Sequence, residues 1–270
     1  MDGGQARELE EARILLQARR EIYGDADHAT LDAMLHLGRT LRDAGELREA
    51  EHVLTTLLSL QHRAGDEGDD RILRTEFNLA IVLDRLGEYD AARRVWERVL
   101  GASDREHGPD SQLSVRTATN LAITLRKQHR YGDEFPLRVR VLEATQRALG
   151  PDHVDTSMAL VELAQTQRNL GNHEMALSLF TEALAGLERS GVDHRAILTQ
   201  KWAIATELVA LKRSKEASAM YDQVVTGAVE HLDPDDPLRR SALRQRRAYW
   251  LLGKTPRLGR KSRQRGSPGC

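Results

Sequence analysis

The sequence predicts an all-α protein, an α-solenoid of about five helix-turn-helix repeats with a flanking capping helix at each end. Three observations support this fold class. Similar blocks recur about 42 residues apart, each block has apolar residues at helical spacing, and Gly, Pro and Asp gather between blocks. Charged residues make up 30 % of the chain, which suits many short elements with solvated outer faces better than one compact globule.

The turn inside each repeat is marked by a residue that recurs at a constant interval. Gly45, Gly87, His129 and Gly171 lie 42 residues apart, and a similar block follows each of them. A fifth block begins at Lys212, one residue early and without the glycine. Glycine suits the left-handed conformation that ends a helix, so these positions predict helix ends.

Each repeat has one apolar template before this turn and another after it. The first reads LGRTL from 37, LAIVL from 79, LAITL from 121, LAQTQ from 163 and IATEL from 204, a spacing that puts three side chains on one helix face. The second is Ala with a bulky apolar residue four positions later, in Ala50/Leu54, Ala92/Trp96, Ala176/Phe180 and Ala217/Tyr221. The small residue lets two helices approach closely, and the bulky one fills the gap below.

Proline-containing junctions separate the repeats. Gly-Pro-Asp occurs at 108–110 and 150–152, and Asp-Pro-Asp occurs at 233–235. Proline cannot continue a helix, and Asp can cap the next one. The predicted solenoid covers 6–253, and a basic tail that we expect to be disordered covers 254–270. The predicted repeats are 27–64, 69–106, 111–149, 153–190 and 194–231, with half-repeats at 6–23 and 237–253.

The third repeat departs from the template of the second helix. Glu134 stands where other copies have Ala, Arg138 stands where they have a bulky apolar residue, and Pro136 lies between them. Proline inside a helix costs about 3 kcal/mol unless it falls in the first turn or kinks the helix. One interpretation is a shifted helix start, with Phe135 and Val139 covering the core. The other is a hinge at this repeat.

The blocks and junctions resemble the tetratricopeptide repeat (TPR), a helix pair of 34 residues with an Ala-x₃-Phe pattern in its second helix. The copies here are eight residues longer and have an LGPDH junction at 149–153. In both respects they are similar to the long TPR variety of kinesin light chains and of bacterial signalling proteins. The resemblance covers about residues 6–253 and implies a concave face lined by the first helices.

A binding groove is predicted on that face. Copies two and three repeat the pattern Arg-x₃-Asn-x₂-Ile-x₃-Arg/Lys. These residues lie beside the three apolar side chains of the first template. Asparagine can pair with a backbone amide through donor and acceptor, arginine favours carboxylate or phosphate, and peptide-binding TPR proteins use asparagines similarly. The alternative is an ordinary solvated face. The predicted groove residues are Arg74, Asn78, Ile81, Arg85, Arg116, Asn120, Ile123, Arg126, Lys127 and Arg168.

A second candidate region is the C-terminal stretch. Eleven basic residues and no acid occur from Arg239 to Arg265, which gives the chain a formal charge of only −1 despite an acidic body. This stretch predicts anion or nucleic-acid contact, contact with an acidic protein surface, or only a solubilising tail. The cations considered for the anion-binding tail are Arg239, Arg240, Arg244, Arg246, Arg247, Lys254, Arg257, Arg260 and Lys261.

The remaining composition narrows the function class. The single cysteine, Cys270, excludes an internal disulfide, no metal motif occurs, and no cofactor or catalytic motif is found, so we expect no enzyme. No run approaches the about 20 apolar residues of a membrane span, and we expect a cytoplasmic protein. We therefore predict an interaction scaffold that holds a peptide segment or partner helix in the concave groove. The alternative is a peptide-responsive regulatory module of a bacterial signalling system.

Overall fold

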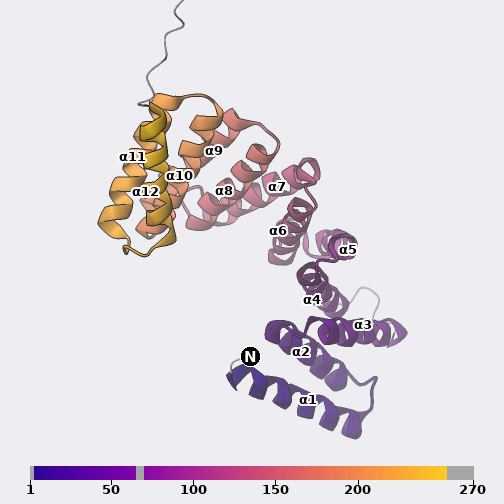
Figure 1. Cartoon of the computed structure of the whole chain (residues 1–270). Coiled ribbons are helices and arrows are strands. Elements are labelled where there is room, and N and C mark those ends of the chain that lie inside the picture. The colour runs from indigo at the N-terminus through magenta and orange to yellow at the C-terminus, as the bar shows by residue number, and fades with distance from the viewer. Residues whose placement is uncertain (1–2, 65–69, 254–270) are drawn as a thin grey trace, which may run out of the picture. The chain divides into compact units, whose positions relative to one another are not determined.

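The computed structural model describes residues 3–64 and 70–253, with side chains described for 4–64 and 70–245. Within these ranges the protein has twelve α-helices and no strand, which confirms the all-α solenoid class (Figure 1). None of these helices is long and apolar enough to cross a membrane. The helices are α1 (Gly3–Tyr23), α2 (His28–Ala44), α3 (Leu47–Ala64), α4 (Asp70–Leu86), α5 (Tyr89–His107), α6 (Gln112–Lys127), α7 (Tyr131–Leu149), α8 (Val154–Asn169), α9 (His173–Ser190), α10 (His194–Ala210), α11 (Ser214–His231) and α12 (Pro237–Gly253).

The helix starts follow the period of the sequence. The first helices α2, α4, α6 and α8 begin 42 residues apart, and so do the second helices α3, α5, α7 and α9. The chain divides into two compact units between Leu179 and Phe180, inside α9. In the first unit, each helix from α1 to α7 packs against the next along the chain. In the second unit, α10 packs against α11 and α11 against α12.

The turn inside each pair has the same backbone hydrogen bond in all five pairs. Glu46 N–H donates to the Leu41 carbonyl, and the equivalent bond recurs four times along the chain, for example from Arg213 to Leu208. This Schellman arrangement needs a left-handed residue at the turn. His129 and Lys212, which replace the recurring glycine, take that conformation with φ of 58° and 60°. The backbone geometry is therefore kept where the glycine is lost.

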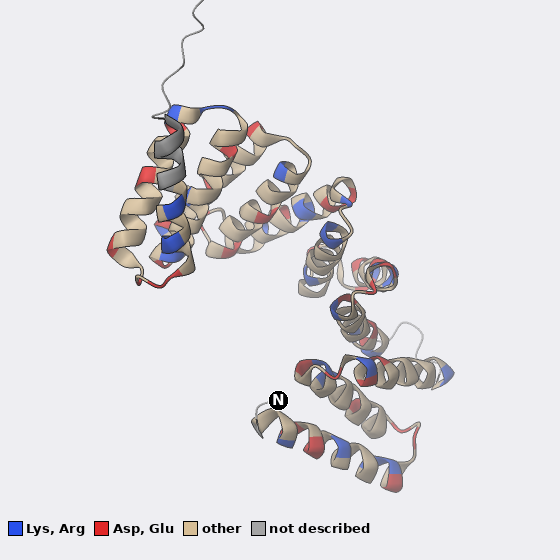
Figure 2. Ribbon diagram, in the orientation of Figure 1, with Lys and Arg blue, Asp and Glu red and all other residues tan. Residues whose placement is uncertain are grey.

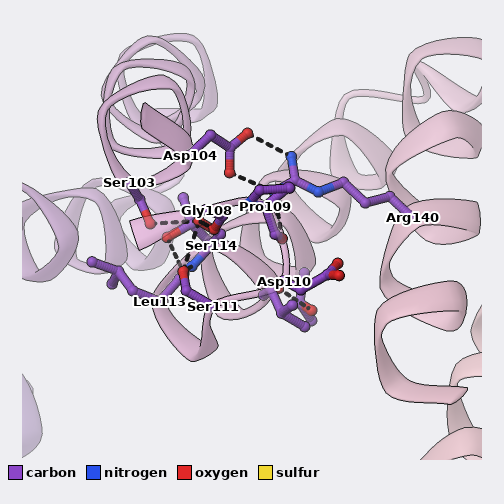
Figure 3. A network of polar contacts seen from close by, with 12 residues as sticks. Ser103, Asp104, Gly108, Pro109, Asp110, Ser111, Leu113, Ser114 and Arg140 are labelled. Carbon is purple, nitrogen blue, oxygen red and sulfur yellow. Dashed lines mark hydrogen bonds and ion pairs between the residues drawn. The ribbon is translucent and has the colours of Figure 1, made fainter. Parts of the chain in front are cut away.

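The junctions between repeats are held by a hydroxyl that caps the preceding turn. Thr30, Ser114 and Thr156 each donate to the carbonyl of the glycine six residues earlier, at 2.7, 2.9 and 2.7 Å. Figure 3 shows the middle junction, where the buried Ser114 Oγ also lies 2.6 Å from Ser103 Oγ. The same short-range bond thus sets the start of three first helices.

An arginine from the next repeat closes the middle junction. Arg140 on α7 donates from both Nη atoms to the carboxylate of Asp104, at 2.8 and 2.5 Å, and from Nη2 to the Pro109 carbonyl at 2.9 Å (Figure 3). Partial burial alone raises the pKa of Asp104, but the hydrogen bonds from Arg140 and Ser114 outweigh it and lower that pKa. Neighbouring repeats are therefore joined by charge as well as by packing.

The core is built by the apolar templates. Ala50, Leu54 and Ala92 are fully buried, and Trp96 packs its ring edge-on against Phe77 with 4.9 Å between centroids. A Cβ added at Gly38 would lie 2.6 Å from Leu54 Cδ2, so a larger residue there would push the first pair apart. In the second unit, Trp202 packs against a small core cluster of Val224, Val225 and Ala242.

The third repeat corrects one expectation. Helix α7 begins at Tyr131, in register with the other second helices, and continues through Pro136, so its start is not shifted. Glu134 and Arg138 are 0 % and 2 % exposed and occupy the two template positions, whereas Phe135 and Val139 are only half-buried. Charged residues fill this part of the core because partners from neighbouring helices reach them. The hinge interpretation stays a prediction.

The partners of these two residues come from α6 and α8. Glu134 Oε1 accepts from Arg126 Nε at 2.8 Å and from Arg138 Nε at 3.0 Å. Glu162 Oε2 lies 2.9 Å from Arg126 Nη2 and 3.0 Å from Arg138 Nη2. We call these four side chains the buried ion cluster. Burial lowers the pKa of Arg138, against the opposing effect of Glu162, while the two carboxylates overcome burial and raise the pKa of Arg126.

Candidate functional site: an arginine-lined groove

A cavity of about 860 Å³ lies along the first helices of the first three repeats. We call it the arginine groove. Its size falls within the usual range of ligand sites, about 300–1,000 Å³. Most of its lining comes from α2, α4 and α6, with one residue from the end of α5. The lining residues are Leu35, Arg39, Arg42, Asp43, Asp70, Arg74, Phe77, Asn78, Ile81, Arg85, His107, Ser111, Leu113 and Arg116.

The groove is positively charged. Five arginines and two aspartates line it, which leaves a net formal charge of +3 with His107 neutral. Both aspartates have partners, since Asp43 pairs with Arg42 at 2.8 Å and Asp70 hydrogen-bonds to His107 at 2.8 Å. Figure 2 shows Lys and Arg bands on α4 and α6. Among the described lining residues, the charge of the remaining arginines is therefore not compensated.

Three of the guanidinium groups are available to a ligand. Arg39, Arg74 and Arg116 are exposed, and none of them has a side-chain hydrogen bond or ion pair within the part of the chain that the structure describes. The guanidinium of Arg116 lies over the ring of Phe77, 5.1 Å from its centroid. This cation–π contact orients the group and leaves its N–H donors free.

The apolar lining gives the groove a surface for packing. Phe77 is 7 % exposed and is fixed by Trp96 beneath it, while Ile81, Leu35 and Leu113 are half-buried. A groove with cations beside apolar side chains suits a ligand that carries both anionic and apolar groups. Apolar packing supplies the buried area, and the charges orient the ligand.

Asn78 is already occupied by contacts within the protein. Its Oδ1 accepts from Arg42 Nη1 at 2.5 Å, and its Nδ2 donates to the Arg74 carbonyl at 2.7 Å. Arg85 Nη1 in turn donates to the Arg42 carbonyl at 2.5 Å. Asn78 and Arg85 thus tie α2 to α4 and hold Arg42. A ligand amide would have to replace these contacts to reach Asn78.

The structure divides the ten predicted groove residues into two sets. One set lines the arginine groove: Arg74, Asn78, Ile81, Arg85 and Arg116. The other set does not: Asn120, Ile123, Arg126, Lys127 and Arg168. All ten remain proposed site residues.

The second set differs in its contacts. Arg126 belongs to the buried ion cluster and also donates to Gln165 at 2.9 Å. Lys127 pairs with Asp84 and lies 5.3 Å from the centroid of the Tyr89 ring. Asn120 is half-buried and its side chain has no hydrogen bond within the described residues, and Ile123 is 36 % exposed. Arg126 and Lys127 therefore already have ion-pair partners within the protein.

Sequence reasoning did not assign several groove residues. Arg39, Arg42 and Phe77 line the cavity but were not among the predicted set. The 42-residue period could have indicated Arg42. This residue lies two repeats before the predicted Arg126, at the equivalent position of its helix. Phe77 carries no such signal, since an aromatic residue inside a helix is more often core than site.

A second cluster of polar groups lies at the rim of the groove. Ligand atoms of Asp70, Glu106 and His107 lie within 4.8 Å of one another, and all three residues are exposed. No sequence motif indicates a metal site here, and Asp70 is already hydrogen-bonded to His107. Exposed acidic groups gather often without an ion, so this cluster supports no assignment.

The C-terminal cations are only partly described. Arg239 is half-buried and donates from Nη1 to the Leu232 carbonyl at 2.7 Å, so it caps the last junction of the array. Arg240 and Arg244 are exposed on α12. The side chains of Arg246 and Arg247, and the whole of Lys254, Arg257, Arg260 and Lys261, lie outside the described residues. The tail hypothesis therefore stays a prediction.

Family models of the tetratricopeptide repeat match residues 30–63, 71–134 and 135–189, more than half of the chain. The chain belongs to the tetratricopeptide repeat family. The match agrees with the twelve helices of the described residues and with their paired arrangement. A search of curated proteins for sequence relatives of this TPR chain found no match.

Solved structures of other TPR proteins share this fold. BtubC (BKLC) from P. vanneervenii is 20 % identical with a TM-score of 0.68, covering 87 % of this chain and 96 % of that one. A putative kinesin light chain from Podosopora anserina is 17 % identical with a TM-score of 0.66, covering 74 % and 95 %. YrrB, described as a TPR protein with an unusual peptide-binding site, is 16 % identical with a TM-score of 0.58, covering 86 % and 99 %. At these identities the likeness concerns the fold.

Proposed function

We propose that this TPR protein is a non-enzymatic interaction scaffold that binds an acidic peptide segment of a partner protein in the arginine groove. One observation carries the proposal. Three exposed guanidinium groups, from Arg39, Arg74 and Arg116, have no carboxylate partner within the described part of the chain, and they share one cavity with an apolar lining. Families built on this fold generally bind proteins or peptides, which supports the same class of partner.

The chemistry of guanidinium favours a carboxylate ligand. Arginine presents its N–H donors in a planar fork that matches two carboxylate oxygens, and such charge-assisted bonds are shorter and stronger than neutral ones. The groove is open enough that water competes, so each contact contributes modestly and several are needed. Packing against Leu35 and Ile81 would supply the remaining affinity.

A selection from a random peptide library tests this function. The full chain is the bait, and we expect the recovered peptides to be enriched in Asp and Glu next to apolar residues. A bait with Arg74→Ala and Arg116→Ala should lose that enrichment. The matched control is Arg94→Ala with Arg105→Ala, since both arginines are exposed on α5 and lie outside the groove. Equal enrichment on all three baits, or none on the intact chain, would contradict the proposal.

A further inference from the structure

We infer that the third repeat contains a pocket for one phenylalanine side chain of a partner protein, between α6, α7 and α8. This inference goes beyond the proposed function, because it concerns a separate cavity and does not require the charges of the arginine groove. It follows from a comparison with the equivalent place in the second repeat, where the chain supplies its own phenylalanine, Phe77.

A cavity of about 180 Å³ lies between these three helices. We call it the phenyl pocket. Helices α6 and α8 both pack against α7 (Figure 1). The walls include Thr119 of α6, Arg138 and Val141 of α7, and Met158 and Ala159 of α8. An engineered cavity of about 150 Å³ in another protein binds benzene, so this volume is sufficient for one phenyl ring.

The phenyl pocket lies where the second repeat has an aromatic pair. In that repeat, Phe77 packs edge-on against Trp96, and these are the eighth residues of α4 and α5. The eighth residues of α6 and α7 are Thr119 and Arg138, and both line the phenyl pocket. A threonine side chain is much smaller than a phenylalanine side chain. The exchange therefore leaves a space that a ring from outside the chain can fill.

The wall formed by α8 has a counterpart as well. The guanidinium of Arg116, the fifth residue of α6, lies over the ring of Phe77. The fifth residue of α8 is Met158, which lines the phenyl pocket and is 47 % exposed. Methionine adapts to irregular gaps and makes favourable sulfur–aromatic contacts. A bound phenyl ring would contact Met158 as Phe77 contacts Arg116.

The polar groups of the pocket wall already have partners. The hydroxyls of Thr119 and Thr145 each donate to the carbonyl four residues earlier in their own helix, at 2.8 and 2.7 Å. Glu162 belongs to the buried ion cluster, and Asp155 Oδ2 lies 3.6 Å from His153 Nδ1. A charged ligand would have to compete with these contacts, whereas an uncharged ring leaves them in place.

Arg138 favours an aromatic ring over an aliphatic side chain. It is 2 % exposed, and its Nη2 lies 3.0 Å from Glu162 Oε2 but makes no hydrogen bond within the described residues. A guanidinium interacts favourably with the face of an aromatic ring. A phenylalanine side chain therefore gains a contact here that a leucine side chain does not.

The phenyl pocket adjoins the arginine groove. Arg116 of the groove and Thr119 of the pocket are three residues apart on α6, and residues at this spacing are neighbours on a helix surface. The exposed side chain of Met158 leaves the pocket open to solvent. These two features favour a side chain that enters from a polypeptide lying across the first helices.

Methionine methyl NMR of the full chain tests the phenyl pocket. The methionine methyl groups carry ¹³C, and the probe is a capped, uncharged Gly-Phe-Gly peptide. We expect a saturable upfield shift of the Met158 methyl signal, because the ring current of a bound phenyl group acts on it. The signal of Met34, which is 1 % exposed in the first repeat, should stay in place. A capped Gly-Leu-Gly peptide should bind about fivefold more weakly.

A filled pocket provides the decisive variant. Thr119→Phe supplies the missing ring, so it should move the Met158 methyl signal upfield without any probe and abolish the response to the peptide. The matched control is Thr119→Val, which keeps the volume of the pocket and should bind the probe like the unchanged chain. Ala159→Leu narrows the pocket from α8 and should also abolish binding. Circular dichroism checks that each variant keeps its helices.

Several results would overturn the inference. These are the lack of a saturable Met158 shift, equal affinity for the two peptides, and binding that persists in both Thr119→Phe and Ala159→Leu. Binding of toluene without binding of the Gly-Phe-Gly peptide would also overturn it, because the cavity would then be closed to the side chain of a partner. The probe carries no charge, so each of these results leaves the acidic-peptide function of the arginine groove untouched.

Discussion

The arginine groove and the buried ion cluster both depend on arginine side chains, but use them for opposite purposes. In the groove, Arg74 and Arg116 are exposed and have no carboxylate partner among the described residues. In the cluster, Arg138 is 2 % exposed and faces two carboxylates. The groove and the cluster belong to the same array of repeats and lie within two repeats of each other. Burial and pairing, more than residue type, decide whether an arginine serves the fold or a ligand.

The largest expected effect comes from breaking the cluster. Glu134→Ala leaves Arg138 buried with one carboxylate fewer, and removing one partner of a buried pair typically costs about 3–5 kcal/mol. We expect a loss of this size in the free energy of unfolding, measured by urea denaturation. Hydrogen exchange should show the loss of protection concentrated in α7.

The paired replacement sharpens that result. Glu134→Ala with Arg138→Leu restores the Ala-x₃-bulky template of the other repeats and leaves Arg126 paired with Glu162 at 2.9 Å. Replacing a buried ion pair by packed apolar residues is often neutral or stabilising. A double variant as unstable as the single one would show that the charges themselves support this repeat.

A smaller effect separates the two asparagines of the predicted groove. Asn78→Ala removes the acceptor of Arg42 and should cost about 1 kcal/mol of stability, because the bond involves a charged donor at a partly exposed site. Asn120→Ala removes no hydrogen bond within the described residues and should change stability by less than about 0.5 kcal/mol. Thermal unfolding measures both. Equal losses would contradict the different roles that we assign to them.

The turns offer a prediction of similar size and opposite sign. His129→Gly and Lys212→Gly relieve the left-handed conformation of a residue with a Cβ and should each stabilise the chain by about 0.5–1 kcal/mol. Gly87→Ala is the reverse control. Its φ is +82° and nothing lies within 4 Å of the added Cβ, so any loss is conformational. Destabilisation by the two glycine variants would contradict this account.

The smallest effect concerns acid. Because the folded carboxyl of Asp104 has a lowered pKa, the unfolded chain binds the proton first as pH falls below about 4. The stability from Asp104 is therefore full above that pH and is lost as pH drops through the folded pKa. Asp104→Asn should make the acid side of the stability profile shallower, as measured by chemical unfolding between pH 2 and 6. An unchanged profile would contradict this role.

The sequence alone was sufficient to predict the arrangement of the helices and the matching positions of two groove arginines. The 42-residue period places the helix starts, and it puts Arg74 and Arg116 at equivalent positions because a solenoid repeats its geometry with its sequence. The pairing state of each side chain was not predictable in this way. Asn78 and Arg126 occupy promising positions, but their partners Arg42 and Glu134 reach them across helix interfaces.

The third repeat shows the physical reason most clearly. Glu134 and Arg138 break the apolar template, and the interpretation of a shifted helix start places Phe135 and Val139 in the core instead. Their burial depends on Glu162, which lies 24 residues beyond Arg138 on another helix. A local hydrophobic pattern cannot reveal that a charged partner on another helix makes it possible to bury these residues.

The central claim is that the unpaired arginines of the groove bind an acidic partner segment. Isothermal titration of one acidic peptide recovered from the library, against three forms of the chain at physiological salt, tests it most directly. We predict that Arg74→Ala/Arg116→Ala weakens binding by about tenfold, since solvent-exposed ion pairs contribute about 0.2–1 kcal/mol each. The Arg94→Ala/Arg105→Ala control should leave the affinity unchanged. Equal weakening by both double variants would show that net charge alone attracts the peptide, and it would contradict the claim.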